Sequence, residues 1–172
     1  ADAQRSLTIW LEARKKYYRE ESTGIDSYPF DVRKLDEDLK QIKRKYHFII
    51  IDSPPSITYD TIQIIKSSDK VFVPVQPSPL DLMATVPFLN LVKQERKKTT
   101  VILNRVMPRA KLTDAMIIRL RYAGAKIARS RISGRIIYAE TFSVGRGVVD
   151  ISVTSEASKE IIKVGNEILR NF

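Results

Sequence analysis

Cysteine is absent from this 172-residue sequence, and histidine occurs once, at His47. The lack of cysteine excludes a disulfide framework, an iron–sulfur cluster and a zinc site built on thiolates. A single histidine without partner ligands argues against a transition-metal centre, so we expect His47 to be structural. No apolar run approaches the roughly 20 residues that a membrane-spanning helix needs, and no signal peptide is recognisable.

Glycine is also scarce: the six glycines are scattered, and no Gly-Lys-Ser or Gly-Lys-Thr sequence occurs. Glycine-rich loops of that kind surround phosphate groups with backbone N–H donors, so these residues include no such loop. Hydrophobic residues make up 43% of the chain and charged residues 29%, which is typical of a globular protein. The length predicts a single domain spanning residues 1–172.

Acidic residues are under-represented in one half of the chain. The net charge is +10, yet residues 1–60 hold 11 basic and 11 acidic side chains, so residues 61–172 carry the whole excess. An imbalance confined to one region favours a surface that binds a polyanion. The alternative is a solvated surface rich in Lys and Arg, as in many thermophile proteins.

The periodicity of apolar residues predicts an alternation of helices and strands. Helices are predicted at 6–18, 31–45, 57–67, 80–96, 113–122 and 154–172, with a short helical or irregular segment at 135–141. Buried strands are predicted at 47–52, 71–75, 99–105 and 126–132, and an edge strand at 27–30. Strands that alternate with helices favour repeated βα units. The predicted fold is therefore an α/β domain with a mostly parallel, twisted sheet and helices on both faces.

The most informative segment is Phe48-Ile49-Ile50-Ile51-Asp52-Ser53-Pro54-Pro55. Four consecutive apolar residues predict a strand buried on both faces, and Pro54-Pro55 prevents a helix from starting at once. Ligands bind at the carboxyl ends of parallel strands, and a carboxylate there holds Mg²⁺ in P-loop nucleotidases. Asp52 stands at that position, although a strand that merely ends in a turn would give the same pattern.

Five motifs, in order along the chain, resemble those of the ParA family of DNA-partition ATPases in its short form. They are Asp2-Ala3-Gln4-Arg5-Ser6 (Asp-Pro-Gln-Gly-Ser in the family), Phe48 to Pro55 (the Walker B strand), Val73 to Asp81 (Pro-Val-x-Pro-Ser), Val101 to Arg105 (Val-Leu-Asn-Arg), and Ile132 to Gly145 (Ile-Pro-x-Arg, then Ala-Glu and Gly). The resemblance implies a P-loop fold of the deviant Walker type. It spans nearly the whole chain.

One family feature has no counterpart here, namely the deviant Walker A loop that precedes the first of these motifs. By the resemblance this loop lies roughly 30 residues before the position of Asp2, after the central strand of the sheet. We therefore expect that the first strand, the phosphate loop and the first helix are missing, and that the chain as given binds and hydrolyses ATP poorly.

The resemblance assigns site residues by position. Asp52 matches the carboxylate that orders a water on Mg²⁺, and Asp2 matches the acidic residue that orients the attacking water. Asn104 matches the amide that reads the adenine edge, and the Ser133-Gly134 turn would place backbone against the base. The family's usual proline is lost at Ser133. The implied ligands are ATP and Mg²⁺.

Family members bind non-specific DNA through basic residues of the C-terminal region. Lys126, Arg129 and Arg131 alternate along one predicted strand, and we expect them to share one face of an edge strand. The predicted DNA-binding patch is completed by four arginines: Arg119, Arg121, Arg135 and Arg146. Its affinity should fall steeply with salt, although each arginine can instead be solvated or ion-paired.

The resemblance implies an ATPase of plasmid or chromosome partition, located in the cytoplasm on the nucleoid. It would dimerise around ATP, bind DNA and hydrolyse ATP when a DNA-bound centromere-binding protein stimulates it. Two alternatives stay open. One is a non-catalytic DNA-binding or adaptor protein on a degenerate ATPase scaffold. The other is a MinD-like positioning ATPase, although we expect the apolar stripe of helix 154–172 to pack internally and not to anchor a membrane.

Overall fold

The computed structural model describes residues 6–19, 24–54, 56–108 and 111–170. The chain forms two compact units: residues 1–69 with 143–145, and residues 70–142 with 146–172. That these units make up one domain stays a prediction.

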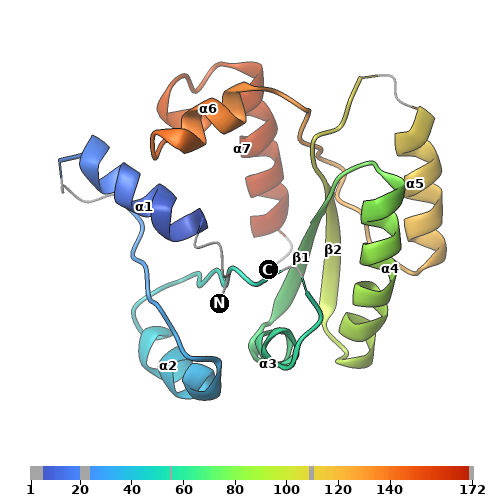
Figure 1. Ribbon diagram of the computed structural model, residues 1–172, viewed down its shortest axis with the longest axis horizontal. Helices are drawn as coiled ribbons and strands as arrows, with labels where there is room; N and C mark the ends of the chain where they lie inside the picture. The colour runs from blue at the N-terminus through green and yellow to red at the C-terminus, as the bar shows by residue number, and fades with distance from the viewer. Residues whose placement is uncertain (1–5, 20–23, 55, 109–110, 171–172) are drawn as a thin grey trace. The chain divides into compact units, whose positions relative to one another are not determined.

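A parallel sheet organises the second unit (Figure 1). Strand β1 (Lys70–Val75) pairs with β2 (Lys98–Leu103), in a register that runs from Lys70 opposite Lys98 to Val75 opposite Leu103. Single parallel bridges extend the sheet beyond β2, from Val101 to Ile127 and from Val106 to Ser133. The predicted strands 71–75 and 99–105 are thus confirmed. The predicted strand 126–132 is reduced to isolated bridges.

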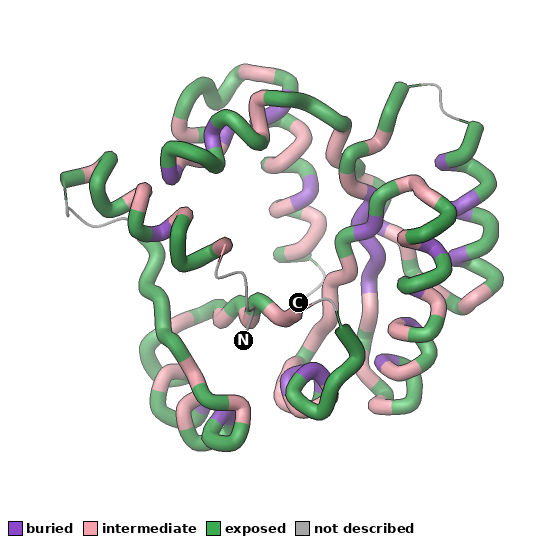
Figure 2. Tube along the Cα trace, viewed as in Figure 1, coloured by how far each residue is buried: buried purple, intermediate pink, exposed green. Residues whose placement is uncertain are grey.

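Helices cover both faces of this sheet. The four residues Val73, Val75, Val101 and Leu103 pack against α4 (Pro79–Gln94) and α5 (Lys111–Tyr122). Phe72 and Ile102 pack on the other face, against α7 (Glu156–Leu169). Successive side chains of a strand point to opposite faces, so both β1 and β2 need apolar residues at consecutive positions. Buried residues accordingly concentrate along β2, at Val75 of β1 and on α4 and α5 (Figure 2).

Local capping sets where α4 begins. Ser78 accepts a hydrogen bond from the Asp81 backbone N–H at 3.1 Å, and its hydroxyl donates to Asp81 Oδ1 at 3.0 Å. Pro79 occupies the first helical position, where no N–H is needed. Two short helical segments, α6 (Ile137–Ser143) and η2 (Val148–Asp150), precede α7.

The first unit contains α1 (Ser6–Tyr17), η1 (Val32–Lys34), α2 (Leu35–Ile42) and α3 (Tyr59–Ser67). Its core is formed by Leu35, Leu39 and Ile64, with Ile49 and Ile51 packed against them. The predicted helix at 31–45 is shorter than expected: Asp31 caps a 3-10 turn, and regular α-helix begins at Leu35.

The predicted strand 47–52 is wrong as a strand. The segment has no regular secondary structure, no described strand pairs with it, and its side chains alternate in burial. Ile49 and Ile51 pack on the core of α2 and α3, whereas Phe48 is 53% exposed and Ile50 is 91% exposed. A segment forms a β-strand only when a neighbouring strand satisfies its backbone hydrogen bonds. No described strand does so here, and the side chains of Phe48 and Ile50 are not covered by described residues. The predicted edge strand 27–30 is likewise unpaired in the described structure.

Candidate functional site

The segment that follows the carboxyl end of β2 lies beside the backbone turn at residues 132–134. Val106 N donates to the Ile132 carbonyl at 2.9 Å, and Gly134 N donates to the Val106 carbonyl at 3.1 Å. Asn104 directly follows β2 and is half-buried. The three residues predicted to contact the base, Asn104, Ser133 and Gly134, therefore lie on adjacent segments at one edge of the sheet. Ligands bind at this edge in open α/β folds.

The backbone after Asn104 is strained. Arg105 has φ +52°, in the left-handed region that non-glycine residues rarely adopt. Asn104 Oδ1 accepts a hydrogen bond from the Arg105 N–H at 2.9 Å, which stabilises this conformation. A side chain at Gly134 would stand 3.3 Å from the Met107 sulfur and 3.6 Å from the Arg105 carbonyl oxygen, so glycine permits the two turns to approach closely. Strain of this kind persists where surrounding contacts hold it, often at functional sites.

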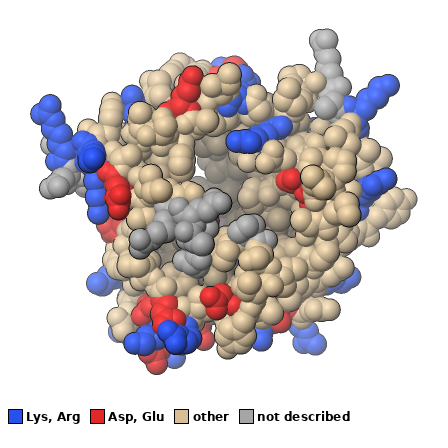
Figure 3. Space-filling view, viewed as in Figure 1, with Lys and Arg blue, Asp and Glu red and all other residues tan. Residues whose placement is uncertain are grey.

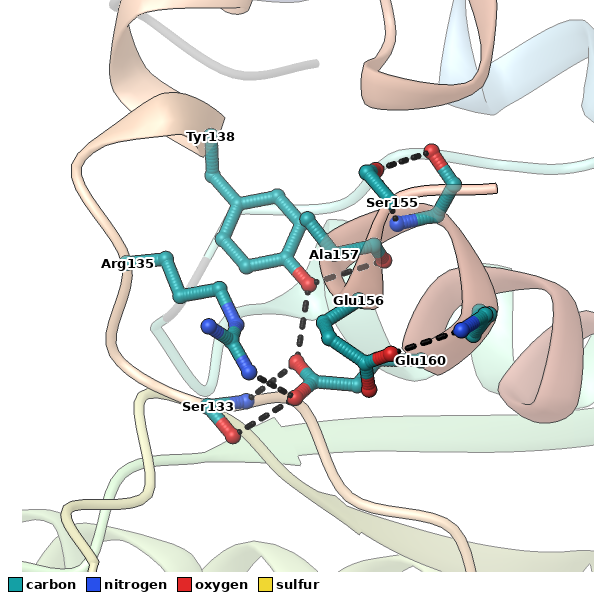
Figure 4. Close-up of polar contacts among 9 residues, drawn as sticks. Ser133, Arg135, Tyr138, Ser155, Glu156, Ala157 and Glu160 are labelled. Carbon is teal, nitrogen blue, oxygen red and sulfur yellow. Dashed lines mark hydrogen bonds and ion pairs between the residues drawn. The ribbon is translucent and has the colours of Figure 1, made fainter. Parts of the chain in front are cut away.

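The Glu160 side chain of α7 forms hydrogen bonds with the turn at Ser133 (Figure 4). Ser133 donates twice, from its backbone N–H at 3.0 Å and from its hydroxyl at 2.8 Å, one bond to each carboxylate oxygen. Arg135 Nη2 donates to Oε1 at 2.8 Å, and the Tyr138 hydroxyl lies 3.0 Å from Oε2. The Glu160 side chain is only 18% exposed. One carboxylate thus gathers donors from three residues of the segment that follows Ile132.

The electrostatics of this cluster favour an ionised Glu160. Burial alone would raise the pKa of the carboxyl, but the donors from Arg135, Ser133 and Tyr138 outweigh it and lower the pKa to about 2. Burial, together with the hydrogen bond to Glu160, raises the pKa of the Tyr138 hydroxyl, which therefore stays protonated as a donor. Glu160 is consequently a fixed anion near neutral pH.

Glu167 makes a similar contact two turns further along α7. Its two oxygens accept from the backbone N–H groups of Arg129 and Ser130, each at 2.8 Å. Burial opposes ionisation of Glu167, yet these donors lower the pKa of its carboxyl. Residues seven apart share a helix face, so α7 holds the 129–133 backbone at two points.

Of the two predicted catalytic carboxylates, Asp52 lies in the first unit. Asp2 lies outside the described residues. Asp52 is exposed and follows the segment 48–51. A single exposed carboxylate suits a water-mediated contact with Mg²⁺, which keeps much of its hydration shell, but it does not suffice to hold the ion. Within the described part of the chain, no group of three or more His, Asp or Glu side chains could hold a metal ion.

The seven predicted DNA-binding residues differ in their surroundings. Arg135 pairs with Glu160 at 2.8 Å, and the half-buried Arg146 donates to the Asp150 carbonyl, so both have structural contacts. The other five are exposed: Arg119, Arg121, Lys126, Arg129 and Arg131. Lys and Arg side chains project from the α5 side of the second unit (Figure 3).

The expectation of one shared face for the strand 126–132 is wrong. The chain bends at Arg129, where Glu167 holds the backbone, so no regular alternation runs through the segment. Lys126 and Arg129 are also three positions apart, which would place them on opposite faces of a regular strand.

Glu160 was missed in the sequence. Its neighbour Ile161 belongs to the apolar stripe of the final helix, but charged residues commonly flank such a stripe, so the sequence carries no specific signal for Glu160. The identity of its partners could not be read from the sequence, because Ser133 lies 27 residues away.

Comparisons with known proteins identify relatives of this chain. A family model described as "AAA domain" matches residues 20–105. "Maintenance of carboxysome distribution protein A" of Halothiobacillus neapolitanus is 27% identical over 176 residues, which cover 98% of this chain and 80% of that protein. "Sporulation initiation inhibitor protein Soj" of Bacillus subtilis is 26% identical over 146 residues, which cover 80% of this chain and 58% of Soj.

A solved structure confirms the fold class. The cell division ATPase MinD of Pyrococcus furiosus superposes with a TM-score of 0.69 at 23% identity, over 83% of this chain and 60% of MinD. The α/β fold with a parallel sheet between helices is therefore shared with this solved structure. Among the described residues, no helix is long and apolar enough to cross a membrane.

Proposed function

Because this chain belongs to the ParA family of P-loop ATPases, we propose that it acts in an ATP-driven positioning system whose matrix is DNA. In this proposal the protein binds ATP with Mg²⁺, dimerises around the nucleotide and binds DNA without sequence preference. A DNA-bound partner protein then stimulates hydrolysis. The cargo would be a plasmid or a chromosome, and the name of the related "Chromosome partitioning protein ParA" of Myxococcus xanthus supports the second.

The observation that supports nucleotide binding best is that the segment after β2, which begins with Asn104, is bonded through Val106 to the turn at Ser133 and Gly134. These segments are joined by backbone hydrogen bonds at the carboxyl edge of β2. An amide offers both a donor and an acceptor, which is what the edge of an adenine requires. A backbone turn without a side chain at Gly134 lets a flat base approach closely.

Hydrolysis is assigned to the carboxylates of Asp52 and Asp2. In the proposal Asp52 orders a water on Mg²⁺, and Asp2 orients the attacking water. Mg²⁺ supplies charge neutralisation for the phosphoryl oxygens. In the full-length protein, Asp52→Asn should lower Mg²⁺-dependent hydrolysis by about 10- to 100-fold, since the residue acts through a metal-bound water. The exposed Asp69→Asn serves as the matched control.

Asp2→Ala should leave ATP binding intact while suppressing turnover. Equal hydrolysis by the wild type and both variants, Asp52→Asn and Asp2→Ala, would refute the catalytic roles. A wild type that binds no ATP would instead favour the non-catalytic adaptor, which needs no nucleotide.

DNA binding is assigned to the exposed basic residues of the second unit. Reversing two charges on α5, with Arg119→Glu and Arg121→Glu together, should abolish ATP-dependent retardation of DNA. At lower salt, where binding is still measurable, the negative slope of log affinity against log salt should become smaller in magnitude by about 2. Each phosphate that the variant no longer binds accounts for about one of these units. The control variant, Lys40→Glu on α2 with Lys43→Glu directly after this helix, changes the net charge equally in exposed residues. Identical slopes for both double variants would contradict this assignment.

A second candidate differs only in cargo. The relative named for carboxysome distribution matches 98% of this chain, and this match is the observation in favour of a protein body as cargo. Fluorescent labels on the replicon and on the protein body distinguish the two cargoes. Only the foci of the true cargo should lose their regular positions when the gene for this protein is deleted. A MinD-like role predicts sedimentation with lipid vesicles in place of DNA retardation.

A further inference from the structure

An aromatic side chain stands in solvent at the end of α5. Tyr122, the last residue of this helix, is 89% exposed, more than any other tyrosine, phenylalanine or tryptophan among the described residues. It forms no hydrogen bond and no ring contact with a described residue. Ile118 lies four residues earlier on the same face of the helix and is 54% exposed. The two residues form an apolar strip on the side of α5 that faces away from the sheet.

Two arginines flank Tyr122. Arg119 precedes it by three residues and Arg121 by one, and an α-helix turns by about 100° per residue, so they lie on either side of it. Both are exposed, and basic side chains project from this side of the second unit (Figure 3). Between Lys111 and Arg131 the chain carries six basic residues and a single acidic one, Asp114. This surface therefore attracts a polyanion, and it repels a second copy with the same charges.

The backbone that carries Tyr122 is fixed. The N–H groups of residues 123–125 donate to the carbonyl oxygens of residues 119–121 at 2.9 to 3.1 Å, which closes the last turn of the helix. Gly124, with φ +81°, lets the chain leave the helix at this point. A tyrosine side chain has only two main rotatable bonds, so it loses little conformational entropy when it binds.

A fixed aromatic ring between two arginines matches the chemistry of a single strand of nucleic acid. The bases of a single strand expose flat faces on which an aromatic ring stacks, and cationic side chains bind the phosphates on either side. In a duplex, neighbouring bases cover both faces of each base, so a ring enters only where two bases are unstacked.

We propose that Tyr122 stacks on an unpaired base and that Arg119 and Arg121 bind the adjoining phosphates. This site gives the protein a contact that single-stranded nucleic acid makes and duplex DNA does not. The inference rests on the proposed function, which assigns DNA binding to the exposed basic residues of the second unit, and it adds a strand-selective contact to that surface.

The experiment compares the affinities of the full-length protein for two fluorescent probes, with ATP and Mg²⁺ present. One probe is an oligonucleotide of thymidines, which forms no duplex, and the other is a duplex of the same length. Tyr122→Ala should weaken binding of the single strand about tenfold, or about 1.4 kcal/mol, and should leave the duplex affinity unchanged. Tyr122→Phe keeps the ring and should bind both probes as the wild type does.

Tyr59→Ala is the matched control, because Tyr59 is 69% exposed and lies on α3 of the first unit. It should change neither affinity. Tryptophan fluorescence reports stacking directly. Trp10 is the only tryptophan, so Tyr122→Trp combined with Trp10→Phe leaves one emitting residue, at the end of α5. The thymidine oligonucleotide should quench this emission, and the duplex should not.

The outcomes separate the inference from the proposed function. A selective loss of single-strand affinity in Tyr122→Ala, with recovery in Tyr122→Phe, supports the role of Tyr122. A wild type that binds the duplex but not the single strand overturns this role and leaves the proposed function standing. The same holds if Tyr122→Ala matches Tyr59→Ala with both probes, or if it weakens both probes equally.

A wild type that binds neither probe overturns the proposed DNA binding, and the inference with it. Sedimentation velocity without nucleotide tests a protein occupant of the strip. Self-association of the wild type that is lost in Tyr122→Ala would assign the strip to a second copy and overturn the inference.

Discussion

Replacing Gly145 with alanine should destabilise the first unit by about 3 kcal/mol. Gly145 is buried, has φ +70° and lies against the backbone of Ala13 and Arg14 in α1. A methyl group there would overlap backbone atoms of that helix, which cannot rotate away as a side chain can. The Arg14 guanidinium also donates to the Gly145 carbonyl at 3.2 Å, and this hydrogen bond would break when the loop moves.

The magnitude combines three effects. A left-handed conformation costs alanine about 1 kcal/mol relative to glycine, and overpacking costs about 1–3 kcal/mol. The broken hydrogen bond adds about 1 kcal/mol. A smaller loss of chain entropy on folding favours alanine by about 0.5 kcal/mol, which leaves a net cost of about 3 kcal/mol.

Gly124→Ala isolates the conformational part. Gly124 has φ +81° at the end of α5, and an added methyl group would meet no atom within 4 Å. Its substitution should therefore cost only about 1 kcal/mol. Urea unfolding gives the free energy of unfolding for both variants, and hydrogen exchange of α1 reports the local effect, which should appear in Gly145→Ala alone. Equal costs and unchanged exchange in α1 would show that the loop does not pack as described.

Three further predictions concern stability. The pKa of Glu160 is lowered in the folded state, so its contribution is present above the ordinary carboxyl pKa and is lost as pH falls towards 2. Full conversion of the shift gives roughly 3 kcal/mol and residual solvent exposure reduces it to about 2 kcal/mol, so the stability gap between the wild type and Glu160→Gln should close below about pH 4.5. Ser78→Ala should cost about 1 kcal/mol in urea unfolding, because it removes the cap of α4. Leu120→Ala, at a fully buried site of α5, should cost about 3 kcal/mol, whereas Leu112→Ala on the exposed side of the same helix should cost under about 1 kcal/mol.

Much of the fold was predictable from local pattern. The helices that became α3, α4, α5 and α7 lie within a few residues of their predicted bounds, since apolar periodicity and caps such as Ser78 act over one or two turns. Strands β1 and β2 were predicted for the same reason: their consecutive apolar residues require cover on both faces.

The predicted strand 47–52 shows where local pattern fails. Its four apolar residues satisfy the same rule as β2, yet Ile50 is 91% exposed. The difference lies in a partner strand, which β2 has in β1 and which the described structure does not provide for 48–51. A β-strand needs the backbone hydrogen bonds of a neighbouring segment, and the apolar pattern of one segment does not show whether such a neighbour is present.

The candidate site divides in the same way. Sequence alone determined which residue types follow each strand, and therefore that Asn104 and the turn at Ser133 stand at carboxyl ends. Only the tertiary structure decided that Glu160, 27 residues further on, holds that turn. Periodicity and capping depend on neighbours along the chain, whereas the partners of a buried carboxylate depend on which helix packs over which strand. That choice is made by the packing of the whole unit.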